Sequence, residues 1–461
     1  MIDSDPIAHE EDLRGYFDLG SKPRERWGVG VEYERLGVFR DTGRAVPYEG
    51  HVSIESMLRT LVRDAGWEAE EEGGHILALR RGGTRLTLEP GAQVELSSAV
   101  HRTLPSLDEE LRGFVDLLEA ASRPFGFTFI GLGVHPISPL DEIGWIPKKR
   151  YAIMRDYLPK RGARAHVMMK QTAGIQVNLD YGSEGDAADK LRTAMALSPL
   201  LTALYANSPL TDGTLNGFLS WRAWAWRETD PDRCGLLPFV FKDGAGFGDY
   251  LEYALDVPMF FVVRGDQWMP ANGLTFRRFL RRGFEGHRAT RSDFELHLST
   301  LFPEVRLKHY IEIRSVDSGE PASALALAAL LKGILYDGAS RRAAWELVRD
   351  MSFKDRERLL DEVCRRGPAA RVVLQGGRHE ASGKVGIIVR DLLLEIVRLA
   401  RQGLNNQGAP GEEAYLEVLD RRLGGEGGCP GFRLAADWNG VLRQDPRRLV
   451  EALAPPLPGS G

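Results

Sequence analysis

The stretch PEVRLKHYIEIRSV, residues 303–316, alternates between apolar and charged side chains. Its odd positions are mostly apolar and include Val305, Ile311 and Ile313. Its even positions read Glu304, Arg306, Lys308, Tyr310, Glu312 and Arg314. Successive side chains of a β-strand point to opposite faces, so the pattern predicts a strand with one apolar and one charged face.

Three other stretches alternate in the same way and put carboxylates or amides on their polar side. Residues 26–39 carry Glu32 and Glu34, residues 86–98 carry Glu89 and Glu95, and residues 168–181 carry Gln176 and Asn178. An antiparallel sheet commonly buries one face and leaves the other polar. Four such strands in one antiparallel sheet predict a charged, concave floor, and we expect the chemistry of the protein there.

The composition is that of a folded protein. The 461 residues are 43% hydrophobic and 27% charged, with a formal net charge of −5, which fits one large unit with a helical extension. No stripe of Lys and Arg with interleaved aromatics occurs, so nucleic acid is not an expected partner. Cys234, Cys364 and Cys429 lie far apart without CxxC spacing, which disfavours a disulfide framework or a zinc–thiolate site.

The sequence also predicts a location. Residues 1–13 are acidic and lack an apolar core, which argues against a signal peptide. The most apolar run, residues 322–331, is interrupted by Lys332 and is too short to span a bilayer. We therefore expect a cytoplasmic protein that does not bind membranes.

Acidic side chains that converge on one surface need cations, because carboxylates repel one another. Hard divalent ions such as Mg²⁺ bind carboxylate oxygens and share the phosphate oxygens of a nucleotide. Arg306, Lys308 and Arg314 suit a phosphate chain, and the amides of Gln176 and Asn178 can bind a metal or orient its water. The polar faces therefore predict metal–nucleotide binding followed by phosphoryl transfer.

Simpler interpretations stay open for each residue. Any one of the acids, taken alone, is more often a solvated surface residue. The three cations could neutralise Glu304 and Glu312 across a strand pair. No GxxxxGK[ST] or GxGxxG motif is present, which disfavours P-loop and Rossmann nucleotide sites. Residues 207–248, rich in glycine, tryptophan and arginine, predict a binding or lid loop. The chain after Ala322 is predicted to be helical almost to its end, with breaks at 375–384, 405–412 and 424–431.

At this point the motifs resemble the plant and proteobacterial glutamate–cysteine ligases. The colinear matches are GVEYERLG (30–37), LTLEPGAQVELSS (86–98), PKKRYAIMRDYLPKRG (147–162), IQVNLDY (175–181), ANSPLTDGTLNGFLSWR (206–222), DPDRCGLLPFVF (230–241), YALDVPMFFVVR (253–264) and FPEVRLKHYIEIRSVD (302–317). The resemblance implies an α+β, glutamine-synthetase-like cradle: a mainly antiparallel sheet, open on one face and covered by helices on the other. It also implies a catalytic core over residues 1–340 and a helical extension over 341–461.

The resemblance further implies a reaction. ATP phosphorylates the γ-carboxylate of glutamate, and the amine of cysteine then displaces phosphate to give γ-glutamylcysteine, the first step of glutathione biosynthesis. ATP, glutamate and cysteine are the implied small-molecule partners, with about two or three Mg²⁺ ions as cofactors. A monomer or homodimer is expected. The alternatives are a ligase with another amine acceptor and a non-catalytic ligand-binding relative.

Site residues follow by motif position. The resemblance implies Glu32, Glu34, Glu89, Glu95 and Glu312 as Mg²⁺ ligands, supported by Gln176 and Asn178, which also count as substrate-binding. Arg306, Lys308 and Arg314 are expected to contact the phosphates of ATP, with Arg314 in a catalytic role. Arg222 and Arg233 are expected to hold the α-carboxylate of glutamate or the phosphate, and Arg233 is the second catalytic candidate.

Overall fold

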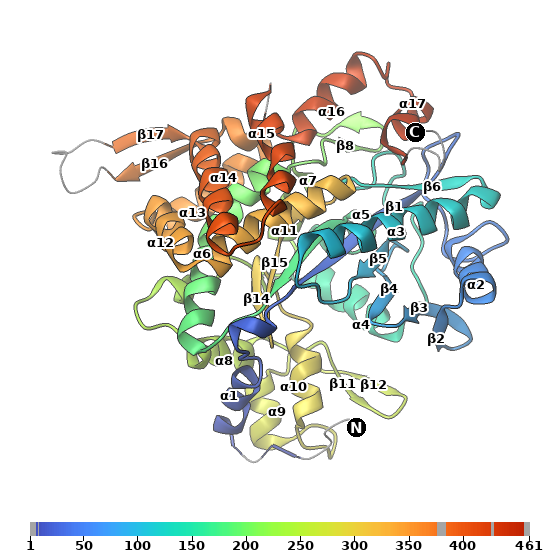
Figure 1. The fold of residues 1–461 in the computed structure, drawn as a ribbon. Helices are drawn as coiled ribbons and strands as arrows, with labels where there is room; N and C mark the ends of the chain where they lie inside the picture. The colour runs from blue at the N-terminus through green and yellow to red at the C-terminus, as the bar shows by residue number, and fades with distance from the viewer. Residues whose placement is uncertain (1–5, 8, 376–383, 426–427, 456–461) are drawn as a thin grey trace.

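A computed structural model describes residues 6–7, 9–375, 384–425 and 428–455. A nine-stranded sheet runs through it in the order β14-β15-β7-β1-β5-β4-β3-β2, with β6 also pairing with β1, and each pairing is antiparallel (Figure 1). The bounds of these strands are β1 Val29–Phe39, β2 Glu68–Glu72, β3 His75–Arg81, β4 Thr84–Leu88, β5 Val94–Ser97, β6 Phe127–Ile130, β7 Gly174–Leu179, β14 Val305–Leu307 and β15 Ile311–Asp317.

Helices make up most of the remaining described chain. Their bounds are α1 Glu11–Asp18, α2 Ile54–Ala65, α3 Leu104–Ser122, α4 Lys149–Tyr157, α5 Ala165–Gln171, α6 Glu184–Tyr205, α7 Trp221–Arg227, α8 Phe247–Asp256, α9 Phe276–Arg282, α10 Arg291–Leu298, α11 Pro321–Tyr336, α12 Gly338–Val348, α13 Phe353–Arg366, α14 Val389–Asn406, α15 Glu417–Gly424, α16 Pro430–Asn439 and α17 Pro446–Leu453. Two-stranded pairs add β8 Leu210–Thr211 with β9 Thr214–Leu215, β10 Cys234–Gly235 with β13 Phe302–Pro303, β11 Phe261–Arg264 with β12 Gln267–Pro270, and β16 Arg371–Gln375 with β17 Lys384–Ile388.

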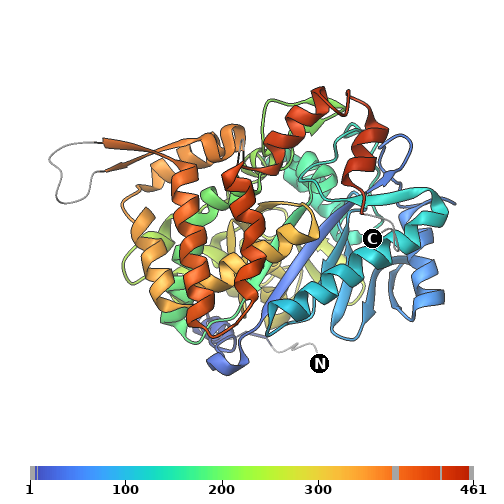
Figure 2. The same ribbon diagram turned by 45° about the horizontal axis from the view of Figure 1, so that its top comes forward.

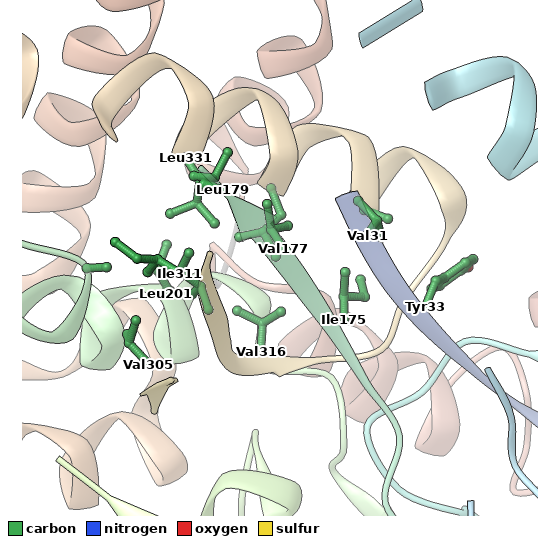
Figure 3. Close-up of a cluster of buried hydrophobic side chains, with 14 of the residues drawn as sticks. Val31, Tyr33, Ile175, Val177, Leu179, Leu201, Val305, Ile311, Val316 and Leu331 are labelled. Atoms are coloured by element: carbon green, nitrogen blue, oxygen red, sulfur yellow. The ribbon is translucent and has the colours of Figure 1, made fainter. Parts of the chain in front are cut away.

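Helices cover the apolar face of the sheet. Helix α6 packs on β15, and α11 packs on β1 and β7. Figure 3 shows the resulting core, in which Val31 of β1, Val177 of β7 and Ile311 of β15 lie beside Leu201 of α6 and Leu331 of α11. The predicted mainly antiparallel sheet with helices on one face is therefore confirmed.

The stretch 303–316 forms a hairpin, where the sequence predicted a single strand. Strands β14 and β15 pair with Val305 opposite Ile313 and Arg306 opposite Glu312. Paired residues in this register have the same parity, so the alternation of polar and apolar side chains continues unchanged across the turn. The pattern alone therefore could not separate a hairpin from one long strand.

An irregularity in β15 then moves the alternation by one residue. Ile313 pairs with Val177, and Val316 pairs with Ile175, so three steps along β15 match two along β7. This β-bulge turns Val316 into the core beside Ile175 (Figure 3), although its even number would place it with Glu312. Bulges often lie beside active sites because they redirect side chains. Here the bulge contains Arg314 and Ser315.

Other sequence predictions need correction. Residues 207–248 hold α7, the first two residues of α8 and several short strands, so they are not one long loop. Residues 168–171 belong to α5, and β7 begins only at Gly174. The chain beyond Ala322 includes the hairpin β16–β17, which projects from the helices in Figure 1. The break predicted over 375–384 lies largely outside the described residues.

The predicted helical extension packs closely on the rest of the chain. Helix α14 lies against α11, and side chains of both helices belong to one hydrophobic cluster. Helix α12, residues 338–348, spans the predicted boundary at residue 340. The division into 1–340 and 341–461 stays a prediction.

Within the described chain no single helix is long and apolar enough to cross a membrane. Helices α11 and α12 reach that length and composition only as a pair, and they meet at an angle of 97°.

Candidate active site

The polar face of the sheet gathers acidic side chains from neighbouring strands. Central strand β1 carries Glu32 and Glu34, and Glu34 faces Glu95 of β5. Glu89 directly follows β4, and Pro90 and Gly91 form the turn that comes next. A side chain at Gly91 would collide with the backbone of Lys170, its Cβ lying 2.2 Å from that carbonyl oxygen, so this turn requires glycine.

Glu34 and Glu95 are buried, with 9% and 8% of their surface exposed. Glu34 accepts hydrogen bonds from the Gly174 backbone amide at 2.7 Å and from Gln176 Nε2 at 3.4 Å. Burial, with the charge of Glu89, raises the pKa of Glu34 to about 7. Burial and the neighbouring acids, Glu32 first among them, raise the pKa of Glu95 well above its usual value.

The acids at the centre of this face lack cationic partners. Within the part of the chain that the structure describes, Glu32, Glu34, Glu89 and Glu95 form no ion pair. Their nearest polar contacts are neutral: Asn178 Nδ2 donates to Glu32 at 3.1 Å, and Thr87 Oγ1 donates to Glu95 at 2.7 Å. These four residues are called the acidic group below.

Glu312 lies in different surroundings, although it sits on the same face. It is fully buried and forms ion pairs with Arg306 at 2.6 Å, with Lys308 at 3.2 Å and with Arg314. Burial alone would raise the pKa of Glu312, but the positive charges of Arg306, Lys308 and Arg314 hold it far below its usual range. Glu312 therefore carries a negative charge in the folded protein at every ordinary pH.

Gln176 of β7 connects the two halves of the face. Its side-chain oxygen accepts a hydrogen bond from Arg314 Nη1, which also donates to Glu312. Its side-chain nitrogen donates to Glu34. The amide thus links a positively charged group at the β15 bulge to the acidic group on β1.

A small cleft opens beside Arg314. It is lined by Arg222, Trp226, Phe302, Glu304, Arg314 and Ser315. Arg222 of α7 is 4% exposed, and its Nη2 donates to the backbone oxygen of Arg314 at 3.0 Å. Its Nε and the hydroxyl of Ser315 are buried without a hydrogen-bond partner among the described residues. A side chain at Gly174 would lie 2.6 Å from Arg222, so glycine is required where the strand passes this guanidinium.

Comparison with known proteins identifies the family. The family model described as glutamate–cysteine ligase family 2 (GCS2) matches residues 28–452, which is most of the chain. The chain belongs to this family.

Curated members of glutamate–cysteine ligase family 2 are similar over most of their length. The chloroplastic glutamate–cysteine ligase of Nicotiana tabacum is 38% identical over 411 residues, covering 88% of this chain and 76% of the relative. That of Arabidopsis thaliana is 36% identical over 456 residues, covering 98% of this chain and 84% of the relative. The predicted cytoplasmic location is wrong by this comparison, because these relatives are chloroplastic proteins.

A solved structure supports the fold. The crystal structure of glutamate–cysteine ligase from Francisella tularensis in complex with AMP superposes with a TM-score of 0.53, covering 94% of this chain and 90% of that one. Its sequence identity is 13%, so the likeness concerns the fold alone. The glutamine-synthetase-like cradle implied by the sequence motifs is confirmed at that level.

Two arginines that are predicted to contact substrates use their hydrogen-bond donors within the protein. Arg233 is fully buried and donates to Asp230, to the Thr300 carbonyl and to the Pro258 carbonyl. Arg306 donates to Glu312 and to the carbonyls of Ser299 and Leu301. These donors are used within the protein, which favours a positioning role for both arginines. The predicted contacts of Arg233 with substrate and of Arg306 with phosphate stay predictions.

Two residues escaped the sequence analysis. Tyr151 of α4 donates to the Leu88 carbonyl at 3.2 Å and lies 3.5 Å from Glu89. Lys148, just before α4, interacts electrostatically with Glu89 and Glu95. Burial, followed by the charge of Arg150, lowers the pKa of Lys148. In the sequence, only the match of residues 147–162 to the family pointed to these two residues. The pattern of a helix does not show that the helix packs over the end of a strand.

The acidic group fits an oxygen-coordinated metal by its chemistry. As the side chains lie, no three acids, histidines or cysteines of the described chain are close enough together to hold a metal ion. The acidic group nevertheless places unpaired, buried carboxylates on adjacent strands, and such carboxylates are the ligands that Mg²⁺ takes. The predicted role of Glu312 as a fifth ligand stays a prediction, since its oxygens now bind cations.

Proposed function

We propose that this protein joins the γ-carboxyl group of glutamate to the amine of cysteine at the expense of ATP, giving γ-glutamylcysteine. Membership of glutamate–cysteine ligase family 2 supports this function. The single structural observation that carries it is the position of the unpaired acidic group beside Arg314 and Lys308 on one open sheet face. The acidic group suits the metal ions that bind the phosphates of ATP. Arg314 and Lys308 suit the negative charge on the phosphoryl group that is transferred.

The acidic group would hold Mg²⁺, with the amides of Gln176 and Asn178 beside it. Bound there, the metal would neutralise phosphate charge and fix the γ-phosphate of ATP for transfer. The side-chain oxygen of Asn178 is buried without a partner among the described residues, so it is available as a further oxygen ligand.

Arg314 and Lys308 would contact the phosphate that is transferred. Both stay partly exposed, whereas Arg306 is buried behind them against Glu312. In the first step an oxygen of the γ-carboxylate attacks the γ-phosphorus and ADP leaves. In the second step the amine nitrogen attacks the acyl carbon, phosphate leaves with the bonding electrons, and the nitrogen loses a proton.

Arg222 is our candidate for the α-carboxylate of glutamate. It is buried in the cleft beside Arg314, and its Nε has no partner in the described chain. A buried guanidinium with a free donor suits a carboxylate, which it can bind through two nitrogens. Glu304 lines the same cleft and could receive the α-ammonium group.

The test is incubation of the protein with glutamate, cysteine, ATP and Mg²⁺, with the product identified by mass and ADP measured separately. We expect γ-glutamylcysteine and ADP in equal amounts, dependent on all four components. ADP release without a ligated product would contradict the proposal. Alanine and 2-aminobutyrate in place of cysteine test the acceptor: equal rates with these amines would contradict the assignment of cysteine while leaving the ligase chemistry intact.

A further inference from the structure

A cavity of about 410 Å³ lies among the helices that cover the apolar face of the sheet. It is bounded by the segment before β1, the start of α3, the end of α11 and the turn after α14, and Figure 2 shows the start of α3 beside that turn. The residues that matter to its chemistry are Arg24, Trp27, Arg102, Lys332, Tyr336 and Glu412. None of them belongs to the catalytic face.

Positive charge exceeds negative charge in the cavity lining. Glu412 is the one acid among the lining residues, and it is already bound by Lys332 Nζ at 2.6 Å and by the Leu104 amide at 2.9 Å. Arg24 donates to the Tyr336 carbonyl at 3.1 Å. Arg24 also interacts electrostatically with Asp337, a residue that does not line the cavity. Arg102 has no side-chain hydrogen bond or ion pair with any described residue.

The remaining walls are partly aromatic. The rings of Trp27 and Tyr336 lie 4.8 Å apart, centroid to centroid, and both line the cavity. Lys190 Nζ lies 3.4 Å from the centroid of the Trp27 ring and helps to hold it in place. A cavity of this volume, lined partly by aromatic rings and partly by polar side chains, has room for a small molecule.

We propose that this cavity binds a small organic anion through a carboxylate or phosphate group. Arg102 and Arg24 bind the anionic group, and Trp27 and Tyr336 pack against the carbon skeleton. The pair of Lys332 and Glu412 closes the inner wall, where it is satisfied without a ligand. This site is separate from the one that would hold ATP and glutamate.

An occupant would touch a residue that ties two catalytic strands together. The hydroxyl of Tyr336 donates to the Gly28 carbonyl at 2.5 Å and accepts from the Asp180 amide at 2.7 Å. Gly28 precedes β1, which carries Glu32, and Asp180 follows β7, which carries Asn178. The cavity therefore adjoins the ends of both strands from the side opposite the acidic group.

Calorimetric titration of the full chain tests the proposal without any enzymatic readout. Citrate is the carboxylate probe and inorganic pyrophosphate is the phosphate probe. We expect at least one to bind, with an affinity that falls fivefold or more in Arg102→Ala and in Arg24→Ala. The probe that loses more affinity in these variants identifies which anionic group the cavity prefers.

Arg278→Ala is the matched control, because Arg278 is an exposed arginine of α9 without a side-chain partner among the described residues. It should leave both titrations unchanged. Binding of either probe to the catalytic face would persist in Arg102→Ala, so only the part lost in this variant is assigned to the cavity. The proposal is overturned if neither probe binds, if Arg102→Ala leaves binding unchanged, or if Arg278→Ala weakens it equally.

Discussion

Arg306 of β14 and Glu312 of β15 face each other across a hairpin, and Nη2 of Arg306 lies 2.6 and 2.9 Å from the two carboxylate oxygens. Lys308 and Arg314 complete a cluster of three cations around one fully buried acid. Removing one member of a buried ion pair leaves uncompensated charge, which is more costly than losing an exposed pair. This arrangement makes Glu312 a structural residue as well as a candidate for function.

Glu312→Gln should lower the free energy of unfolding by about 3–5 kcal/mol, because three cations would then surround a neutral amide. Urea unfolding followed by circular dichroism measures the change. Glu68→Gln is the control: Glu68 pairs with Arg80 on the surface, and its loss should cost at most about 1 kcal/mol. Equal stability of the two variants would refute a structural role for Glu312.

The raised pKa of Glu34, about 7, makes stability depend on pH. The folded state keeps a proton on this carboxyl group to a higher pH than the unfolded state does. Its contribution is therefore complete below the unfolded pKa, near 4.5, and is lost as pH rises to about 7. With divalent cations removed by chelation, we expect a loss on the order of 3 kcal/mol from this group over that interval.

Glu34→Gln removes that titration, because an amide does not ionise. Unfolding free energies measured at pH 5 and pH 8 should therefore differ less in this variant than in the unmodified protein. Glu32 and Glu95 have pKa values raised in the same direction, so some dependence on pH should remain. An identical pH dependence in both proteins would show that Glu34 is ionised throughout.

Magnesium should oppose the same repulsion. At pH 8 the acidic group carries more negative charge, and a cation bound there should raise the melting temperature further as its concentration increases relative to its Kd. Glu95→Gln should weaken Mg²⁺ binding by roughly tenfold or more, since one buried oxygen ligand loses its charge. Glu49→Gln, an exposed acid outside the group, should leave binding unchanged. Calorimetric titration with MgCl₂ alone compares the three proteins, and equal affinities would remove Glu95 from the metal site.

Period-two alternation was sufficient to predict which strands share a polar face. Glu32, Glu34 and Glu95, with Gln176 and Asn178, lie on that face because a strand separates its side chains by parity whatever its neighbours are. The pattern also predicted antiparallel pairing, because one face is polar and the other apolar throughout. These predictions depend only on local geometry.

Features that depend on contacts between segments far apart in the chain could not be predicted from the sequence pattern. Arg306 and Glu312 pair with each other and both have even numbers, so the turn between them leaves the alternation of side chains unchanged. The bulge that turns Val316 into the core can be recognised only from the pairing of β15 with β7. Arg233 lies in an arginine-containing motif like Arg222, but only its contacts with Asp230 and backbone carbonyls show that its donors are used internally. The sequence likewise left open whether the nearby cations neutralise Glu312 or contact phosphate, and only the packing shows that they form ion pairs with Glu312.

Arg314→Lys should reduce kcat by about a hundredfold or more while changing the KM for ATP much less. The guanidinium donates to Glu312 and Gln176 at once and lies at the β15 bulge, so its position is fixed toward the open face. Lysine keeps the charge but loses the planar fork that can bind two oxygens of a transferred phosphate. Initial rates of ADP formation at varied ATP measure both constants.

Arg278→Lys, on the exposed surface of α9, should behave as the unmodified protein. A structural role alone would predict lower stability with kcat retained per folded molecule, so urea unfolding of Arg314→Lys separates the two explanations. If kcat stays within twofold of the unmodified enzyme, Arg314 is not the group that stabilises the transferred phosphate.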